Sequence, residues 1–552
     1  MNPLSRIRRR PAPAIRAGAS LAAISLAIAL AQPAQAQSFN GTYNPTFPLG
    51  FANIFTSPGG GTPATPPTTT IEVYSPQTVI DWTPNDTTGT GTVNFQPAGT
   101  TAIFTNGTTG GVTDFTVLNR IVPTDPNGAP QSRAIAFNGA VQSLIYDINA
   151  NSAPGGHVWF YSPTGIVVGS TAKFDVGSLV LTTDPIDLTD GLFGTNGEIR
   201  FRGNPGSTGY VQINSGAQIA TQINPATLGS AYVALVAPHI EQGGTIAADG
   251  PVALVAAEQV DITINAGLFD IAVTQGTSDG NGIVHTGSTG GPTTVASGSS
   301  PQVALVAVPK NDGMTMLLSG TMGYTPATVA SPDGGAVVLS AGNGLGYDST
   351  GAAATGNITI GDAVFTSALK ASASDTISVT PANLTQFNKA ATLSALQKVD
   401  ITAADGAIID AQNSLGLSLD VYTGTDNFLD ASSVGGDGMG GTIAIDIGDG
   451  TLSTALSLEI DASGSGGASY GQGGNGIGGT VGIAASQGTI TTGSLDLHVS
   501  GSGGSGDVTG GNGSGGSASL SAAQGATADF QSIYADAYGY GGTSYYGTGG
   551  NG

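Results

Sequence analysis

The sequence predicts an all-β protein, and within that class a right-handed parallel β-helix, or solenoid, with glycine-rich extruded loops. The first observation behind this prediction is composition: 88 of 552 residues are glycine and only 9% are charged, against about 25% in an average globular domain. Glycine costs about 1 kcal/mol in a helix interior, whereas the abundant Val, Ile and Thr favour strands. The other two observations are internal repeats, with periods of about 19 residues and about 37–38 residues.

Residues 1–36 have the pattern of a bacterial secretory signal peptide. Five arginines precede an apolar run at 17–30, and Ala34 and Ala36 form a cleavage site that makes Gln37 the first mature residue. The run is shorter than the ~18–20 residues of a membrane-spanning helix, and no later segment is long and apolar enough. We therefore expect a mature chain without a transmembrane segment, secreted or displayed on the bacterial surface.

Charge and cysteine content narrow the possible partners. Removing the signal peptide leaves nine basic residues against 37 acidic ones, a formal charge of −28. Such a chain repels phosphate backbones, which argues against nucleic-acid binding. The chain has no cysteine, and a large continuous core needs no disulfides. We also hypothesise that a chain crossing an outer membrane unfolded gains by avoiding cross-links.

The first repeat is Val-Ala-Leu-Val, found at 233–236, 252–255 and 303–306, with a related segment at 336–340. The spacing between the first two copies is enough for one solenoid coil of two or three short strands. One of these strands is expected within 244–250. In such coils alternate apolar side chains point inward, and neighbouring coils hydrogen-bond at ~4.8 Å.

The second repeat fills residues 431–552. Its markers at 441–443, 479–481 and 516–518 recur at spacings of about 38 and about 37 residues. Each unit holds three strand-like runs and then a Gly/Ser-rich stretch, so we expect one three-strand coil per repeat plus an extruded, flexible glycine loop. The final Gly-Gly-Asn-Gly precedes a new coil elsewhere in the chain, and we therefore expect the natural protein to continue beyond Gly552.

Three other segments depart from the simple coil pattern. Residues 37–70 are rich in Gly, Pro and Thr and are expected to form an extended lead-in that caps the first coil. Residues 266–300 have the character of an insertion or hairpin, and residues 385–399 are the only plausible helix in the mature chain.

A sharp turn separates two apolar runs within residues 158–183. Pro163 fixes φ at about −65°, Gly165 can take the positive φ of a tight corner, and Ser162 can bond the backbone locally. Taken alone, the turn is simply a solenoid corner. The residues of interest are Ser162, Pro163, Thr164, Gly165, Ile166, Gly169, Val176, Gly177, Ser178 and Leu179.

This segment resembles the motif region of the filamentous haemagglutinin N-terminal domain, the secretion domain of two-partner secretion exoproteins. In that family an apolar strand runs into Asn-Pro-Asn-Gly-Ile, then a Gly and a Val-Gly-Ser-Leu segment. Residues 162–166, Gly169 and residues 176–179 are similar to these three parts, with Ser162 and Thr164 replacing both asparagines. Residues 117–121 and 233–264 are also similar to family segments, although no Asn-Pro-Asn-Leu motif is found upstream.

The resemblance covers roughly residues 38–265 and implies a two-partner secretion domain at 37–265, captured by an outer-membrane β-barrel transporter. The other predicted parts are the signal peptide at 1–36, a continuation of the β-helix with insertions at 266–430, and the glycine-rich repeats at 431–552. Because both turn asparagines are replaced, the identity of the transporter stays open.

No residue pattern indicates an enzyme, a cofactor or a metal site. The histidines at 157, 239, 285 and 498 lack zinc spacing, and there is no phosphate-binding loop. The one Gly-x-Ser-x-Gly match, at 467–471, lies in a glycine loop. Glycine-rich segments lack the Asp of the calcium β-roll, which leaves only weak surface Ca²⁺ binding open. Tyrosines 534, 538, 540, 545 and 546 are interpreted as exposed strand or loop residues, with stacking on sugars as the alternative.

These observations predict a secreted or surface-attached filamentous exoprotein that is adhesin-like, with host or neighbouring-cell glycans or proteins as possible targets. Two alternatives stay open: an autotransporter passenger, and the stalk of a contact-dependent toxin that continues past residue 552. A β-helix polysaccharide lyase is disfavoured, because its clustered carboxylates beside an Arg or Lys base are not found among nine scattered basic residues.

Overall fold

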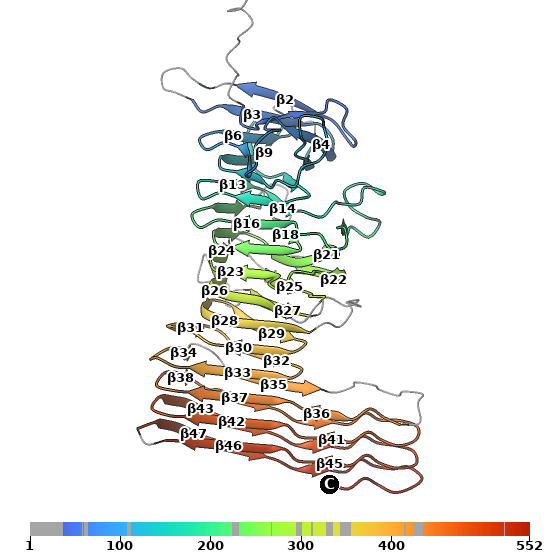
Figure 1. The fold of residues 1–552 in the computed structure, drawn as a ribbon, viewed down its shortest axis with the longest axis vertical. Coiled ribbons are helices and arrows are strands. Elements are labelled where there is room, and N and C mark those ends of the chain that lie inside the picture. The colour runs from blue at the N-terminus through green and yellow to red at the C-terminus, as the bar shows by residue number, and fades with distance from the viewer. Residues whose placement is uncertain are drawn as a thin grey trace, which may run out of the picture.

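The computed structural model describes residues 37–57, 59, 65–107, 112–223, 231–265, 268–293, 301–310, 313–326, 335–342, 355–412, 416–423, 434–523 and 525–552. Ala34 and Ala36, with the rest of the predicted signal peptide, lie outside these residues. The described residues contain strands and no helix, hence no candidate membrane-spanning helix. They stack along one long axis, from the first coils in blue to the last repeats in red (Figure 1).

The strands stack on three parallel faces, which confirms the predicted β-helix. Face 1 stacks β4 (Gln77–Pro84), β7 (Thr116–Ile121), β11 (His157–Tyr161), β14 (Ser178–Thr182), β18 (Val233–Ala237), β21 (Val252–Asn265), β25 (Gln302–Ala307), β27 (Ala336–Ala341), β29 (Ala368–Ala373), β32 (Ala391–Ala395), β35 (Leu417–Thr423) and β39 (Ser457–Asp461). Face 2 stacks β5 (Val93–Gln96), β8 (Ile135–Phe137), β12 (Ile166–Val168), β16 (Tyr210–Ile213), β19 (His239–Gln242), β23 (Ile283–His285), β26 (Gly313–Pro326), β28 (Gly356–Phe365), β30 (Thr376–Val379), β33 (Lys398–Ala403), β37 (Thr442–Ile447), β42 (Thr480–Ala485) and β46 (Ser517–Ala522). Face 3 stacks β3 (Thr68–Val73), β6 (Thr101–Thr105), β9 (Ala140–Tyr146), β13 (Lys173–Val176), β17 (Gln218–Thr221), β20 (Thr245–Ala248), β24 (Ser288–Thr293), β31 (Leu384–Phe387), β34 (Ile408–Ala411), β38 (Thr451–Thr454), β43 (Thr489–His498) and β47 (Thr527–Asp536).

Four strands run round a corner without a break. β26 and β28 continue from face 2 into face 3, where they connect β24 to β31. β43 and β47 continue from face 3 into face 1 and extend the stack beyond β39. The strands outside the three faces are β1 (Gly41–Tyr43), β2 (Ala52–Ser57), β10 (Ser152–Pro154), β15 (Ile199–Arg202), β22 (Leu268–Gly276), β36 (Gly438–Gly440), β40 (Gly464–Ser465), β41 (Gly476–Ile477), β44 (Gly501–Ser502), β45 (Gly513–Ser514) and β48 (Gly539–Tyr540).

Like residues stack in the core of the solenoid. Val233 and Leu235 of β18 align with Val252 and Leu254 of β21, and the same pattern continues into β25. All four side chains are fully buried. The coil predicted from the Val-Ala-Leu-Val spacing is therefore confirmed, as is the short strand expected within 244–250, which is β20. The coils also continue past residue 265, because β21 pairs directly with β25.

A small antiparallel sheet covers part of face 1 from outside. β15 and β22 flank the outer half of β21, and we call these three strands the outer sheet. It forms a second hydrophobic core over face 1 that includes Trp159, Phe201 and Ile271. The hairpin expected within 266–300 is present, but it begins earlier, where Ala257 pairs with Gly276. No Gly or Pro interrupts β21, so one strand serves both the coil and the hairpin.

The lead-in segment closes the N-terminal end of the core, as predicted. β1 pairs antiparallel with β4, and β2 pairs antiparallel with β3. Phe39 is buried against Trp82 and Phe95, at ring-centroid distances of 5.2 and 4.9 Å. Antiparallel pairing at this end matters because an open parallel edge invites association with other chains.

The helix expected at 385–399 is wrong. The structure places β31, β32 and the start of β33 there. Buried residues alternate with partly exposed ones along β31 and β32. The buried residues are Thr385, Phe387, Ala391, Leu393 and Ala395. This period of two matches the strands of neighbouring coils, and coil stacking therefore overrides the local helix propensity of Ala, Leu and Gln.

The glycine-rich repeats contain one coil each, as predicted. Thr442 of β37 aligns with Thr480 of β42, and Thr480 aligns with Ser517 of β46. Between successive coils the chain runs outward and returns, and so forms a projecting double layer. We call these segments the glycine arms (residues 462–478, 499–515 and 537–552). Figure 1 shows the arms stacked at the C-terminal end, with β36, β41 and β45 on their returning segments.

The expectation that these glycine segments are flexible is wrong. Outgoing strands β40, β44 and β48 pair with one another, as do returning strands β36, β41 and β45. The two layers are also hydrogen-bonded, since Gly474 N–H donates to the carbonyl of Gly467 at 2.9 Å. Glycine is required because the backbones approach so closely: a Cβ on Gly474 would lie 2.0 Å from the Gly436 carbonyl oxygen.

Replacing Gly474 by alanine is expected to open the arm, because the added carbon must displace backbone rather than a side chain; we expect a cost of about 1–3 kcal/mol. Gly482→Ala is the matched control, since its Cβ would meet nothing nearer than Ser519 Oγ at 3.8 Å. Limited proteolysis and hydrogen exchange of residues 464–478 measure the effect. Equal protection in both variants would show that the layers are not packed this closely.

Candidate functional site

The motif residues picked out from the sequence form one complete coil. β11, β12, β13 and β14 are its strands, and Ser162 to Gly165 make the corner between β11 and β12. His157 of β11 aligns with Ser178 of β14, so the chain completes one full turn between these two residues. The structure therefore brings the whole motif together within a single turn of the solenoid.

The corner is held by backbone geometry and one side-chain hydrogen bond. Gly165 has φ +147°, and a Cβ there would lie 3.0 Å from Ala134 Cβ. Thr164 Oγ1 donates to the Arg133 carbonyl at 2.6 Å, tying this corner to the preceding coil. The local bond expected from Ser162 is wrong: its Oγ is buried and has no hydrogen-bond partner among the described residues. Its backbone N–H donates to Thr182 instead.

The other motif residues pack against neighbouring coils. Ile166 aligns with Ile135 below and Val211 above. Leu179 aligns with Val158 and Val233 and is fully buried.

The two remaining motif glycines are needed for close approach. A Cβ on Gly169 would lie 1.9 Å from Asn138 Oδ1, and one on Gly177 would lie 2.6 Å from the Gly156 carbonyl oxygen. Gly177 N–H donates to Ser143 Oγ at 2.9 Å. Next along the chain, Val176 and Ser178 are both buried.

Asn119, from the upstream Val-Leu-Asn-Arg-Ile segment, joins three consecutive coils. Its Oδ1 accepts from Trp82 Nε1 at 3.0 Å, and its Nδ2 donates to the Trp159 carbonyl at 3.2 Å. The next residue, Arg120, makes a two-pronged ion pair with Asp81 at 2.6 and 2.8 Å. A buried amide with both ends satisfied fixes the register of its coils, and no sequence pattern indicated these partners.

A buried acidic pair, which sequence reasoning missed, lies where the outer sheet joins face 1. Asp184 follows β14 and Glu258 lies in β21, and both are fully buried. Burial, and then the charge of Glu258, raise the pKa of Asp184 to about 8. Burial and the charge of Asp184 likewise raise the pKa of Tyr161. Glu258 itself pairs with Lys310 Nζ at 2.5 Å.

The surroundings of this pair make it a junction between chain segments. Glu258 also accepts from Ser278 Oγ at 3.2 Å and from Gly206 N–H at 3.1 Å. Neither carboxyl oxygen of Asp184 has a hydrogen-bond partner in the described part of the chain. Glu258 was detectable in principle, because it is the only charged residue in the apolar segment 250–260.

The histidines lie apart, each with its own partners. His157 contacts Asp114 at 3.2 Å, and His498 contacts Asp536 at 2.7 Å. His239 contacts Glu241, whereas His285 is buried, which lowers its pKa to about 4. Within the ranges described, no three His, Asp or Glu side chains gather in a way that could hold a metal ion.

No family model matches the chain, and no curated protein matches its sequence. One similar solved structure is the HMW1 secretion domain from Haemophilus influenzae, with 13% identity and a TM-score of 0.43, covering 90% of this chain and 99% of that one. Another is the filamentous hemagglutinin secretion domain, with 12% identity and a TM-score of 0.24, covering 91% and 100%. Because both TM-scores are below 0.5, the functional assignment rests on the chain's own residues.

Proposed function

We propose that this protein is a non-enzymatic, filamentous exoprotein, adhesin-like, exported across the outer membrane by a β-barrel partner that recognises residues 37–265. The observation that carries the proposal is the motif at 162–179, whose residues form one complete coil with a glycine-dependent corner. The predicted signal peptide supports passage across the inner membrane, and the antiparallel lead-in gives the N-terminal coil a closed end.

The solenoid suits export of an unfolded chain. Each coil contacts only its neighbours, so coils can form one after another as the chain emerges. Each new coil buries apolar side chains on the preceding one, which provides about 25 cal/mol per Å² of apolar surface removed from water. The chain contains no cysteine that a disulfide could lock before export.

The corner of the motif provides the first test. The double variant Pro163→Ala, Gly165→Val is expected to remain largely inside cells that express the transporter, because valine at φ +147° is strained and meets Ala134. A left-handed backbone costs a non-glycine residue about 1–2 kcal/mol. The fraction of protein in the medium, measured by quantitative immunoblot, reports the result.

A second strained corner supplies the matched control. Gly406, with φ +77°, lies between β33 and β34, outside residues 37–265. Gly406→Val is expected to leave export near wild type although its backbone strain is comparable. If both variants are retained equally, the corner at 162–165 acts only through folding, and the motif is not a secretion determinant.

A further inference from the structure

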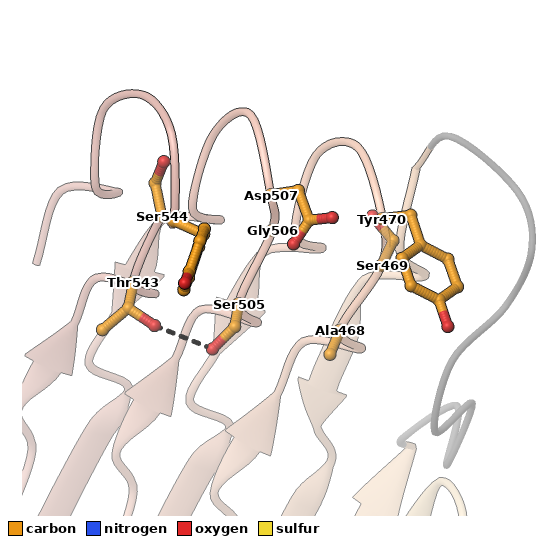
Figure 2. Close-up of a pocket in the computed structure, with 9 residues that line it drawn as sticks. Ala468, Ser469, Tyr470, Ser505, Gly506, Asp507, Thr543 and Ser544 are labelled. Carbon is orange, nitrogen blue, oxygen red and sulfur yellow. Dashed lines mark hydrogen bonds between the residues drawn. The ribbon is translucent and has the colours of Figure 1, made fainter.

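A groove crosses the tips of three successive glycine arms. It is formed by residues 468–470, 505–507 and 543–545 and has a volume of about 420 Å³. Figure 2 shows the three tips side by side, with Tyr470 at one end, Asp507 in the middle and Ser544 towards the other end. This volume falls in the range of small-ligand sites.

The register of the arms places equivalent residues in columns along the solenoid axis. Gly506 bridges to Ser469 on one side and to Ser544 on the other, which aligns Tyr470, Asp507 and Tyr545 as the next residues. Neighbouring strands are about 4.8 Å apart, so the two tyrosines are separated by roughly 10 Å with the aspartate between them. Gly506 lines the groove with backbone packed closely against its own arm: a Cβ there would lie 2.1 Å from the Thr509 carbonyl oxygen.

The two tyrosines of this column face solvent, and Asp507 between them is partly exposed. Tyr470 is 57% exposed and Tyr545 is 79% exposed. Ser505 and Thr543 form a hydroxyl pair at 3.0 Å along the wall of the groove, and their oxygens can accept further hydrogen bonds (Figure 2). Tyr545 also packs edge-on against Tyr546 at 4.6 Å, which limits its freedom.

The charge of the region restricts the ligand. Residues 399–552 contain no Lys or Arg, and Asp507 makes no ion pair in the part of the chain that the structure describes. An anionic ligand would therefore meet a carboxylate without any counter-charge nearby. The groove suits a neutral ligand that offers apolar faces to tyrosine and hydroxyl donors to the carboxylate and the hydroxyl oxygens.

We propose that this groove binds a neutral glycan, with pyranose rings packed on Tyr470 and Tyr545 and a sugar hydroxyl pair donating to Asp507. The chain of rings would run along the solenoid axis, because the polar and aromatic groups repeat from arm to arm at a distance similar to the length of one ring. An isolated ammonium group is a poorer fit, since it would fill only one interval of a groove that spans three arms. This groove would be the contact surface of the proposed adhesin, so its biological role rests on the proposed function.

The test uses the purified mature chain, residues 37–552, and isothermal titration with neutral oligosaccharides of three to six hexose or N-acetylhexosamine units. Wild-type protein is expected to bind at least one of these, and Tyr545→Ala or Asp507→Asn is expected to weaken binding about tenfold. Tyr538→Ala is the matched control, because Tyr538 is 59% exposed on another part of the arm and is expected to leave the affinity unchanged.

Three results would overturn the proposal: no binding to any neutral oligosaccharide, binding to sulfated or sialylated ones instead, or an equal loss in Tyr538→Ala. Binding of oligolysine that depends on the same residues would assign the groove to cationic peptides. The titration involves no export step, so its failure leaves the secretion proposal untouched. Conversely, a failed export assay leaves the groove untouched.

Discussion

Replacing Asp184 by asparagine is expected to stabilise the outer sheet against opening by about 2–4 kcal/mol at pH 8, and to change its stability little at pH 4. The carboxyl group is fully buried, and its two oxygens have no hydrogen-bond partner among the described residues. Burial, and then the charge of Glu258, raise its pKa to about 8. Asparagine has nearly the same shape and carries no charge, so it avoids the cost of ionisation.

The sign of the pH dependence follows from proton binding. An unfolded aspartate titrates near pH 4, so the folded protein holds one additional proton on Asp184 between about pH 4 and pH 8. The stability that the protonated Asp184 contributes to the folded state is complete below pH 4 and is lost as the pH rises through 8. The outer sheet of the wild type should therefore weaken with rising pH over this window, and Asp184→Asn should remove that part of the slope.

Tryptophan fluorescence can measure this directly. The chain has two tryptophans, and Trp159 lies in the second core beneath the outer sheet, so the difference in tryptophan fluorescence between matched variants during urea titration reports opening of that sheet. Asp86→Asn is expected to have the opposite effect on stability, because the hydrogen bond from Arg133 lowers the pKa of Asp86 to about 2. That variant should lose stability at pH 7. Equal pH slopes for wild type and Asp184→Asn would contradict the account of the buried pair.

Replacing Lys310 by methionine is expected to destabilise the same junction by about 3 kcal/mol, because the change leaves Glu258 buried and without its cation, and breaking a buried pair costs about 3–5 kcal/mol. We expect the lower end of that range because Ser278 and Gly206 still donate to the Glu258 carboxylate. The fluorescence of Trp159 under urea again supplies the measurement.

Lys398→Met is the matched control for this prediction. Lys398 pairs with Asp400 at 2.7 Å, but the Asp400 side chain is 32% exposed, whereas Glu258, the partner of Lys310, is fully buried. Exposed ion pairs contribute about 0–1 kcal/mol, so this substitution should change stability little. If the two lysine variants behaved alike, the pairing of Lys310 with Glu258 would have no special structural role.

Much of the fold could be predicted because the solenoid repeats its own pattern. Val233 and Val252 begin successive Val-Ala-Leu-Val copies and lie one coil apart in space, and Thr442 and Thr480 show the same relation in successive glycine-rich repeats. The repeat length alone thus predicted the register between coils. The failure at 385–399 has the opposite origin, since a short window contains helix formers but not the neighbouring coils that select strands.

What the sequence could not provide were contacts between segments without a repeat relation. The glycine arms contain residues typical of flexible linkers, and only the pairing of one arm with the next shows why Gly474 needs to be glycine. Asp184 and Glu258 are far apart in sequence and come near each other because β14, β18 and β21 stack on face 1. Ser162 stands where the resembling family has an asparagine, yet its Oγ makes no local bond.

Recognition of residues 37–265 by the transporter is tested by an export assay with two deletions, expressed with and without the outer-membrane transporter. Both deletions keep the signal peptide; one removes residues 37–265 and the other removes residues 434–552. We expect the wild type and the second deletion to reach the medium only when the transporter is present, and the first deletion to stay in the periplasm. Export of the chain lacking residues 37–265 at the wild-type level, or export without the transporter, would contradict this expectation.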